Sequence, residues 1–433
     1  MRKLGLEIGN VGLIRKAVVR LDGITVITGH NKTGKSTIGK VLYALGRGFN
    51  SQTDYKAEFR NRVVQRLGAF ALMLPRGEKA RNIPDGCAIS RLLNGTYEKD
   101  ERAAVKSFLD QLKSEIDALY RDSLLSDALD DAYKYILGTS PEDYADGHVE
   151  TMLSIEFNNN FTPVRDLSSE SKVVLGTFES GNGELHGIYK ATAGNNRFTD
   201  FNARVGYQSV LPVPVYIDDA YILDDLMSTE DETDKSVPDH RSLLRRQLRE
   251  CQRVLASTME RLGGGQELES VLDLLHGLLP GSLESSNGSL VYKENGYGAL
   301  QLGNLATGEK FFTVLSMLLQ SGQLAKDGLL ILDEPEAHLH PEWINMLARV
   351  IVLLHKTMNI STVMTTQSVN MVLAIEAFST AEGVEDDASF YKPEKQEDGM
   401  VRFEEADDMR DVYGDLVADY EMAYNLLLEQ ERS

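Results

Sequence analysis

Hydrophobic and polar positions alternate with the two-residue period of β-strands near the N-terminus. Leu4, Leu6 and Ile8 alternate with polar residues or glycine, and residues 24–27 form a short apolar run. Side chains on a strand point to opposite faces in turn, so this pattern predicts several short strands over residues 4–28.

The rest of the chain predicts a mixture of helices and strands, typical of an α/β fold. A glycine-rich turn follows the last N-terminal strand, and no internal repeat or extended heptad pattern occurs. The remaining predicted elements are, in chain order, a helix over 35–45, a mainly helical stretch over 50–140, a β-like stretch over 150–217, an acidic loop over 224–239, helices over 240–262 and 267–279, a hairpin over 288–302, and then helix, strand, helix and strand over 311–321, 329–332, 341–355 and 361–366.

The composition is that of a globular protein and excludes a mainly disordered chain or a small disulfide scaffold. The 433 residues are 42% hydrophobic and 26% charged, which allows two to four domains or one large α/β domain with insertions. The net charge of −21 argues against a uniformly basic nucleic-acid coat, although it permits a local basic patch. Only Cys87 and Cys251 are present, which we interpret as reduced thiols. No long apolar run or signal peptide is evident, so we expect a cytoplasmic protein without a membrane span.

A phosphate-binding pattern, G-x-x-x-x-G-K-[ST], occurs at residues 29–36 between a predicted strand and a predicted helix. Glycines let successive N–H groups turn toward an anion, and a helix N-terminus adds positive potential. In this pattern Lys35 reaches the β and γ phosphates of a nucleotide, and the Ser36 hydroxyl holds Mg²⁺. The alternative is a chance glycine-rich turn. The residues that we expect at the phosphates are Gly29, Asn31, Lys32, Thr33, Gly34, Lys35, Ser36 and Thr37.

An apolar run that ends in two carboxylates forms the second motif, Gly-Leu-Leu-Ile-Leu-Asp-Glu-Pro at residues 328–335. Its apolar part predicts a buried central strand, whose carboxyl end is where ligands bind in open α/β sheets. We expect Asp333 to join Ser36 in the Mg²⁺ shell and Glu334 to polarise the attacking water as a general base. The alternative is an acidic helix N-terminus without chemistry.

The order of further segments makes a family resemblance specific. Residues 302–312 resemble the signature segment of ABC-type ATPases, with Ala306-Thr307-Gly308-Glu309 in place of the usual serine-glycine pair. The run Asp-Glu-Pro-Glu-Ala-His-Leu-His-Pro ends at Pro341, and a strand ending in Thr-Thr-Gln-Ser368 follows. This ordered set resembles the ABC-ATPase heads of the structural-maintenance-of-chromosomes (SMC) and overcoming-lysogenization-defect-like (OLD-like) groups, the latter including AAA-type ATPases of bacteria.

The resemblance implies a P-loop ABC-ATPase head with a mixed sheet and with helical and β insertions, and it covers about residues 1–45 and 300–380. It also implies ATP and Mg²⁺ as cofactors and an ATP-dependent homodimer, in which Thr307, Gly308 and Glu309 of one copy cover the γ-phosphate held by the other. Members of the group commonly act beside a separate effector from the same operon, in defence against phage. This implies a companion effector protein here. No region like a TOPRIM nuclease is evident.

The domain layout that we predict follows from these motifs. The ATPase head comprises 1–50 and 290–381, with a mainly helical insert at 51–150, a β-rich part of the head at 151–222, a helical insert with a basic stripe at 223–289 and an acidic segment at 382–433. The acidic segment is interpreted either as a partner-docking element or as a solubilising end.

One position departs from the pattern of this group, and two nearby histidines raise the question of a metal site. The strand over 361–366 ends in Thr-His-Ser in this group, whereas Gln367 stands here in place of the histidine. Glutamine does not titrate near neutrality, so we assign Gln367 a catalytic position but expect slow turnover or a long-lived ATP state. His338 and His340 invite a metal interpretation, but no third ligand is apparent, which favours structural or dimer-contact roles.

Two basic regions leave alternatives open. Arg241, Arg245, Arg249 and Arg253 recur every four residues on one predicted helix face, and residues 56–91 are also locally basic. The arginine stripe is either a nucleic-acid contact or a solvated face paired with this chain's own acidic loop. An SMC-like ATPase that acts directly on DNA, and a scaffold that binds ATP with little turnover, therefore remain alternatives to an ATPase that controls a partner effector.

Overall fold

The fold is taken from a computed structural model that describes part of the chain. The described residues are 3–50, 110, 141–163, 169–179, 184–203, 210–226, 239–257, 266–279, 281–286, 289–294, 298–337 and 339–418. The chain divides into two compact units, of which the first comprises 1–50, 152–230 and 239–433 and the second 51–151 and 231–238. The predicted helical insert and the basic region 56–91 lie mostly or wholly outside the described residues.

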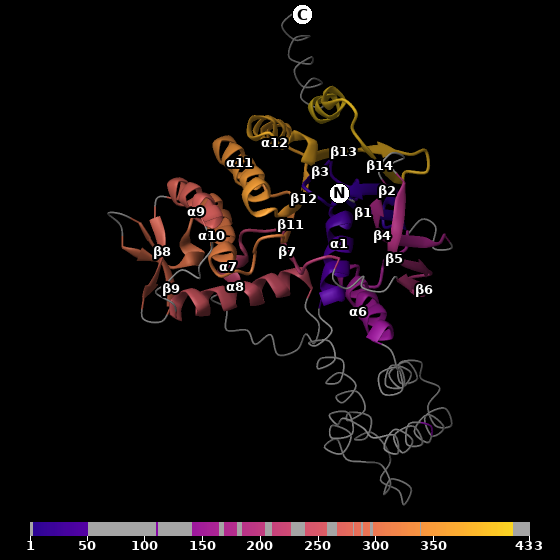
Figure 1. The fold of residues 1–433 in the computed structure, drawn as a ribbon, viewed down its shortest axis with the longest axis horizontal. Coiled ribbons are helices and arrows are strands. Elements are labelled where there is room, and N and C mark those ends of the chain that lie inside the picture. Colours follow the sequence, from indigo (N-terminus) through magenta and orange to yellow (C-terminus); the bar gives the residue numbers. More distant parts are fainter. Residues whose placement is uncertain are drawn as a thin grey trace, which may run out of the picture. The chain divides into compact units, whose positions relative to one another are not determined.

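A mixed sheet forms the centre of the first unit (Figure 1). Its strand order among the described residues is β6-β5-β4-β1-β2-β14-β13-β3-β12-β11-β7. The parallel part comprises β13 (Ala388–Lys395), β3 (Ile24–Thr28), β12 (Ser361–Thr366), β11 (Leu329–Asp333) and β7 (Pro214–Ile217). Strands β3 and β7 are buried at every position, as expected for strands covered on both faces. The predicted α/β fold with a mixed sheet is thus confirmed.

The N-terminal and middle strands extend this sheet in mainly antiparallel pairing. Strand β1 lies between β2 and β4, and β4, β5 and β6 follow one another in hairpin order. The bounds of these strands are β1 (Lys3–Val11), β2 (Ile14–Arg20), β4 (Ser171–Phe178), β5 (Leu185–Gly194) and β6 (Arg197–Ala203).

Two strands of the sheet come from the acidic C-terminal segment, which the sequence pattern did not predict. Strand β13 pairs in parallel with β3, and β14 (Val401–Glu405) pairs with both β13 and β2. Residues 409–418 are helical, and Val412 and Leu416 from this stretch are buried. The first part of the acidic segment is therefore built into the core, because its Phe390, Tyr391 and Phe403 are apolar enough to fill it.

Six of the helices, α7 to α12, share one buried core with the parallel strands. That core gathers buried residues from these helices and from strands of the sheet. The helices are α1 (Lys35–Asn50), α6 (Pro141–Glu156), α7 (Ile222–Asp225), α8 (His240–Ser257), α9 (Gln266–Leu278), α10 (Thr307–Gln320), α11 (Pro341–Met358) and α12 (Val369–Glu382), with 3₁₀ turns at Leu302–Asn304 and Glu385–Asp387.

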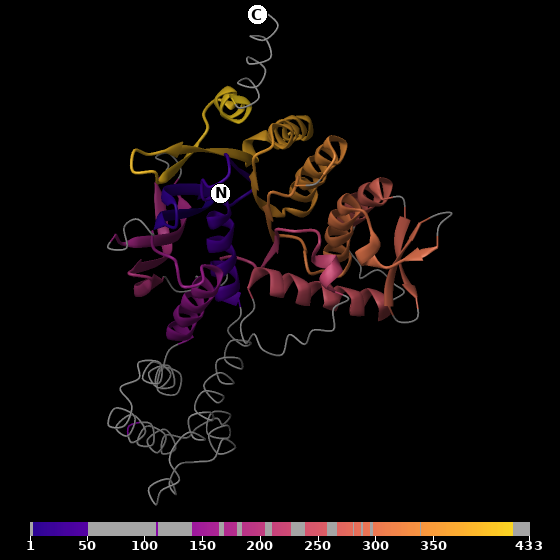
Figure 2. The same cartoon turned by 180° about the vertical axis from the view of Figure 1, so that it is seen from behind.

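A small second sheet lies beside α8, where the sequence predicted a hairpin. It contains β8 (Gly281–Ser286), β9 (Ser289–Glu294) and β10 (Ala299–Leu300) in antiparallel order. Both views of the molecule place this sheet at one end of α8, which also packs along α10 (Figure 2). The extra strand β8 begins at Gly281, three residues after the end of α9 at Leu278.

Parallel strands bring the two sequence motifs together. Strand β12 pairs with β3 on one side and with β11 on the other, and Thr366 lies opposite Thr28 while Thr365 lies opposite Asp333. The carboxyl ends of all three strands therefore meet at one edge of the sheet, where ligands bind in open α/β folds. The glycine-rich loop follows β3, Gln367 follows β12, and Asp333 is the last residue of β11.

Candidate functional site

The glycine-rich loop between β3 and α1 needs its two pattern glycines for conformational reasons. Gly29 has φ of +133° and Gly34 has φ of +89°, a region that residues with a Cβ rarely adopt. A Cβ on Gly29 would also lie 2.5 Å from Cγ of Pro393 on β13. The loop is thus held tightly against the sheet.

Lys35 is the first residue of α1, and its side chain folds back over the loop. The Nζ atom donates to the carbonyl oxygens of Gly29 at 2.7 Å and His30 at 3.0 Å. It also lies 3.3 Å from Oε1 of Glu334, and only 4% of the lysine side chain is exposed. The ammonium group is therefore enclosed by oxygen atoms of the loop and of Glu334.

Asp333, at the end of β11, accepts hydrogen bonds on both of its carboxylate oxygens. Oδ1 accepts hydrogen bonds from the Ser36 hydroxyl at 2.9 Å and from the Thr365 hydroxyl, and Oδ2 accepts one from the Tyr216 hydroxyl at 3.3 Å. Burial and the nearby Asp333 carboxylate raise the pKa of Tyr216 well above its ordinary value, so this phenol keeps its proton. The predicted pair of Ser36 and Asp333 is brought together, although the residues are 297 positions apart.

Glu334 has a left-handed backbone conformation that turns the chain away from the strand direction. Its φ is 49°, which is uncommon for a residue other than glycine. The conformation is held because its N–H donates to both the carbonyl and the hydroxyl oxygen of Thr365, each at 3.1 Å. Its Oε2 accepts a hydrogen bond from Nε2 of Gln367 at 3.2 Å. Lys35, Glu334 and Gln367 thus form one contiguous polar group.

Glu336 is a residue of the site that the sequence analysis did not single out. Its Oε1 accepts hydrogen bonds from the Thr366 hydroxyl at 2.6 Å and from the Gln367 N–H at 3.2 Å. Burial raises the pKa of Glu336 above its ordinary value, partly offset by these hydrogen bonds. A second glutamate two positions after Glu334 was the only available sequence signal, and its contact with the end of β12 required the fold.

The segment predicted to resemble a signature sequence forms the N-terminus of α10. The Thr307 hydroxyl lies 3.0 Å from the hydroxyl of Tyr221, and Glu309 Oε2 accepts the Ala306 N–H at 2.9 Å. Gly308 packs so closely against Trp343 that a Cβ would lie 2.6 Å from a ring carbon. The sequence did not indicate Tyr221, whose side chain remains partly accessible.

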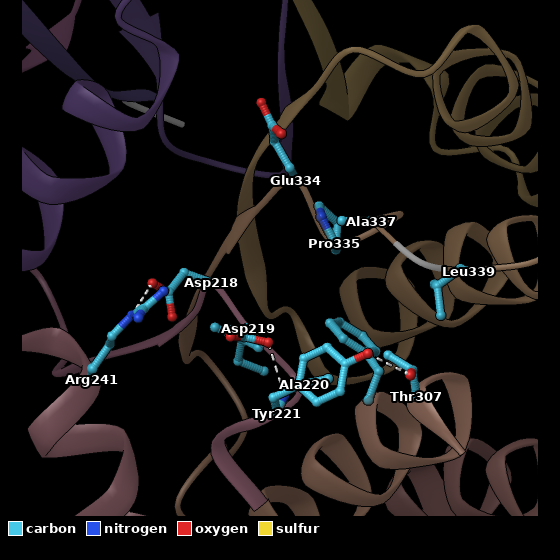
Figure 3. A pocket seen from close by; sticks show the side chains of 12 residues that line it. Asp218, Asp219, Ala220, Tyr221, Arg241, Thr307, Glu334, Pro335, Ala337 and Leu339 are labelled. Atoms are coloured by element: carbon cyan, nitrogen blue, oxygen red, sulfur yellow. Dashed lines mark hydrogen bonds and ion pairs between the residues drawn. The ribbon is translucent and has the colours of Figure 1, made fainter. Parts of the chain in front are cut away.

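A pocket of about 210 Å³ is lined both by residues that follow β11 and by the N-terminus of α10. Its lining includes Glu334, Pro335 and Ala337 after β11, Tyr221 after β7, and Thr307 on α10. In Figure 3 the Tyr221 hydroxyl points toward Thr307, and Glu334 lies at the other end of the lining. The predicted Glu334 and Thr307 thus border one cavity within a single copy of the chain.

The other predicted loop residues lie around the glycine-rich turn. Asn31 and Lys32 are exposed, and Lys32 has a positive φ of 65°. The Thr33 hydroxyl donates to the His30 carbonyl at 2.9 Å, and the Thr37 N–H donates to the Gly34 carbonyl at 3.0 Å. These contacts keep the turn closed at the start of α1.

The arginine stripe on α8 already makes contacts within the chain. Arg241 forms an ion pair with Asp218, and Arg253 forms one with Glu250 at 3.2 Å. Arg245 and Arg249 are half-buried. Nucleic-acid binding by this stripe stays a prediction, and ion pairs within the chain already engage Arg241 and Arg253.

The remaining histidines and cysteines show no metal site within the described ranges. Among those residues, no group of three His, Cys, Asp or Glu side chains could hold a metal ion. The His340 side chain accepts the Glu342 N–H at the start of α11. Cys251 is a buried free thiol whose pKa burial raises to about 11, whereas Cys87 and His338 lie outside the described residues.

Comparison with protein families identifies the chain's membership. A family model described as "AAA domain, putative AbiEii toxin, Type IV TA system" matches residues 106–373, which is more than half of the chain. The chain belongs to this family. The match includes Asp333, Glu334 and Gln367 but begins after the glycine-rich loop. The predicted membership in an AAA-type ATPase group is thereby confirmed, and this family places the chain among nucleotide-binding ATPase domains.

Solved structures with similar folds are heads of SMC proteins. One is an SMC head bound to the C-winged helix domain of ScpA, with 12% identity over 94% of this chain and 98% of that chain and a TM-score of 0.40. The SMC head domain from Thermotoga maritima has 13% identity, coverage of 94% and 100%, and a TM-score of 0.40. An Smc head with an extended coiled coil, bound to the C-terminal domain of ScpA and derived from Pyrococcus furiosus, has 14% identity, full coverage of both chains and a TM-score of 0.39.

Similarity at this level carries no functional argument. A search of curated proteins found no match. None of the helices in the described ranges combines the length and the apolarity that crossing a bilayer requires.

Proposed function

We propose that the protein binds and hydrolyses ATP, with Lys35 and the loop N–H groups at the phosphates, Asp333 and Ser36 at Mg²⁺, and Glu334 at the attacking water. One observation carries the proposal. The glycine-rich loop and the acidic end of β11 meet through the Ser36–Asp333 hydrogen bond of 2.9 Å and the Lys35–Glu334 ion pair of 3.3 Å. A loop that merely turned the chain would not require these partners.

The oxygen donors at this point fit Mg²⁺. The ion takes one or two protein carboxylates or hydroxyls and completes its octahedron with waters and phosphate oxygens. Asp333 and Ser36 supply one carboxylate and one hydroxyl, already within hydrogen-bond distance. When bound, the cation neutralises charge on the phosphates. Thr365 keeps its hydroxyl on Asp333 Oδ1 and thereby restrains the carboxylate in the plane that faces Ser36.

Lys35 changes partner in the proposed cycle. In the described state its ammonium group contacts two loop carbonyls and the Glu334 carboxylate. A γ-phosphate is a stronger partner for an ammonium group than a carbonyl or a single carboxylate is, because the phosphate carries more negative charge. Phosphate binding therefore releases Glu334 from Lys35, and the carboxylate becomes available to accept a proton from water.

Gln367 is proposed to hold Glu334 rather than to move protons. Its Nε2 donates to Glu334 Oε2 at 3.2 Å, and the Gln367 N–H is in turn held by Glu336. An amide can orient a carboxylate but cannot titrate near neutrality. Slow turnover with a long-lived ATP state follows from this arrangement.

The output of the ATPase is proposed to be homodimerisation that controls a companion protein. The α10 N-terminus, with Thr307 and Gly308, would cover the γ-phosphate of a second copy. The partly exposed Tyr221 beside Thr307 supports a contact surface there. The family description, which names a toxin–antitoxin system, supports a setting with a companion effector. Anti-phage defence and a cytoplasmic location are the corresponding proposals.

The decisive experiment is phosphate release and ATP binding measured on the parent protein and two variants. Lys35→Ala should lose ATP binding and hydrolysis together, because the phosphate contact is removed. Glu334→Gln should retain binding and lose hydrolysis by about 100-fold or more, the usual contribution of a general base. A parent protein that binds ATP but releases phosphate no faster than Glu334→Gln would favour the ATP-binding scaffold instead.

A further inference from the structure

Tyr216, on β7, is buried beneath the proposed Mg²⁺ site and touches one of its residues. It is 1% exposed, and its hydroxyl donates to Asp333 Oδ2 at 3.3 Å. Oδ1 of the same carboxylate faces Ser36 and Thr365. Tyr216 therefore holds the oxygen that points away from Ser36, and the two sets of bonds together fix the carboxylate's rotation.

The phenol ring of Tyr216 is itself held by a stacked imidazole. Its ring centroid lies 4.4 Å from that of His240, with an interplanar angle of 25°. Tyr43 of α1 completes the cluster, with its ring centroid 6.0 Å from both Tyr216 and His240. Aromatic rings in stacked or edge-to-face arrangement at these separations stabilise one another beyond their buried area.

Two carboxylates clamp His240 in place. Oε1 of Glu156 accepts a hydrogen bond from the backbone N–H of His240 at 2.8 Å, and Oε2 of Glu156 lies 2.7 Å from Nδ1 of the ring. On the other side of the ring, Asp218 Oδ2 lies 3.2 Å from Nε2. Side-chain exposure is 10% for His240, 1% for Glu156 and 13% for Asp218. With a carboxylate at each ring nitrogen, the imidazole is held as a cation, and a cation over an aromatic face is attractive. Figure 3 shows Asp218 also paired with Arg241.

The clamp lies at points where the chain connects to the second unit. Glu156 is the last residue of α6, four residues after the first unit resumes at Met152. His240 is the first residue of α8, immediately after that unit resumes at Asp239. Tyr43 lies on α1, whose end at Asn50 is the last residue before the second unit begins. All the clamp residues belong to the first unit.

We propose that Tyr216 is a positioning residue for Asp333, and that the clamp of Glu156, His240 and Asp218 sets the position of its ring. This inference rests on the proposed ATPase function. It means that displacement of α6 or α8 at the clamp reaches the Mg²⁺ site through two side chains, His240 and Tyr216. The clamp residues themselves do not touch nucleotide in this arrangement and act only through the phenol.

The test is the Mg²⁺ dependence of nucleotide binding, measured with a fluorescent ATP analogue in EDTA and across a Mg²⁺ titration. Tyr216→Phe should raise the Mg²⁺ concentration for half-maximal binding by about tenfold, the usual weight of a hydrogen bond to a charged group. Its binding of the analogue in EDTA should change less than about twofold, because the phosphate contacts of Lys35 remain. Steady-state hydrolysis should show the same shift in Mg²⁺ dependence.

Tyr43→Phe is the matched control. It removes the same hydroxyl from the same aromatic cluster, but the Tyr43 hydroxyl is buried and has no hydrogen-bond partner among the described residues. Its Mg²⁺ titration should match the parent. Equal shifts in both variants, or no shift in Tyr216→Phe, would overturn the proposal, since either result makes the phenol a packing element only.

Glu156→Gln tests the clamp where Tyr216→Phe is insoluble. Glutamine keeps one acceptor oxygen, which can serve either the His240 N–H or Nδ1 but not both, and it removes the charge that holds the imidazole. We expect Glu156→Gln to raise the Mg²⁺ concentration for half-maximal binding by about threefold, which is less than the shift in Tyr216→Phe. Glu156→Ala should raise it further than Glu156→Gln does. Unchanged Mg²⁺ titrations in both Glu156 variants would overturn the proposal that the clamp sets the position of the Tyr216 ring. A parent protein that binds no ATP analogue refutes the ATPase proposal itself, whereas normal parent binding with an unchanged Tyr216→Phe refutes only this inference.

Discussion

Lys35 and Glu334 form an ion pair of 3.3 Å across the candidate site, with Glu334 also held by Gln367 at 3.2 Å. The lysine side chain is almost fully buried, and the carboxylate is 29% exposed. The group that would bind phosphate and the group that would activate water therefore neutralise each other in this state. In the proposed cycle nucleotide binding separates them, so the pair would oppose both phosphate binding and water activation.

Glu334→Gln should bind ATP more tightly than the parent, by about three- to tenfold. The substitution removes both the competitor for Lys35 and a negative charge beside the incoming phosphates. Equilibrium binding of ATP in the presence of Mg²⁺ measures the effect. Glu284→Gln is the control, because Glu284 on β8 also pairs with a lysine, Lys293, at 3.1 Å but lies on the small sheet. Weaker binding of ATP by Glu334→Gln would contradict the idea that Glu334 competes with the phosphates for Lys35.

Gln367→His should accelerate phosphate release at pH 8 by about tenfold or more, because a neutral imidazole beside Glu334 can transfer a proton. Its rate should fall as the pH drops through about 6.5, where an unperturbed histidine becomes protonated. The parent should lack this step. Rates measured from pH 5.5 to 8.5 test the idea, and a histidine variant no faster than the parent would count against it.

Thr307→Arg should prevent ATP-dependent dimerisation and leave ATP binding by the single copy within about twofold. The arginine would crowd the α10 N-terminus, whereas a change at Gly308 would also disturb Trp343 and confuse folding with assembly. Light scattering with and without ATP, in the Glu334→Gln background, reports the mass. Thr380→Arg makes the same change at an exposed threonine of α12. A Thr307→Arg protein that still dimerises would contradict the proposed interface.

His240 makes folding stability depend on pH. Burial alone would lower the pKa of His240, but hydrogen bonds to Asp218 and Glu156 raise it to about 9. The unfolded value is about 6.5, so the stabilisation is fully present below pH 6.5 and is lost as the pH rises through 9. We expect about 3 kcal/mol to be lost across that window.

Chemical unfolding of the parent and of His240→Gln at pH 6, 7.5 and 9.5 measures this contribution of His240 to the free energy of unfolding. The difference between the two proteins should be largest at pH 6 and should shrink as the pH rises. The pKa of Asp218 is lowered by His240 and Arg241 despite its burial, so its own contribution is lost only as the pH falls below about 3.8. A difference that stays constant between pH 6 and 9.5 would exclude a charged His240.

Much of the candidate site could be predicted from sequence because its local geometry demands particular residue types. A strand-to-helix turn with positive φ at Gly29 and Gly34 needs glycine there, and a fully buried strand needs the apolar run before Asp333. Helix α9 and the two strands that precede the glycine-rich loop, β2 and β3, were predicted for the same reason, since period and turn chemistry are local properties.

Strands β13 and β14 were not predicted, because an acidic composition hid short apolar stretches that only pairing with β3 and β2 makes into strands. The last part of α6, residues 150–156 with Glu156 at its end, was likewise expected to be β-like, and that prediction was wrong. Strand propensity depends on neighbours in the sheet more than on the segment itself.

The sequence by itself determined the fold class, the position of the glycine-rich loop and the pair of carboxylates at the end of β11. Only the tertiary structure decided which side chains hold those groups: Thr365 and Tyr216 on Asp333, Gln367 on Glu334, and His240 on Tyr216. The physical reason is that a tyrosine, a threonine or a histidine at these positions has no distinctive local pattern. Its role arises only when parallel strands bring residues distant in the chain within hydrogen-bond reach.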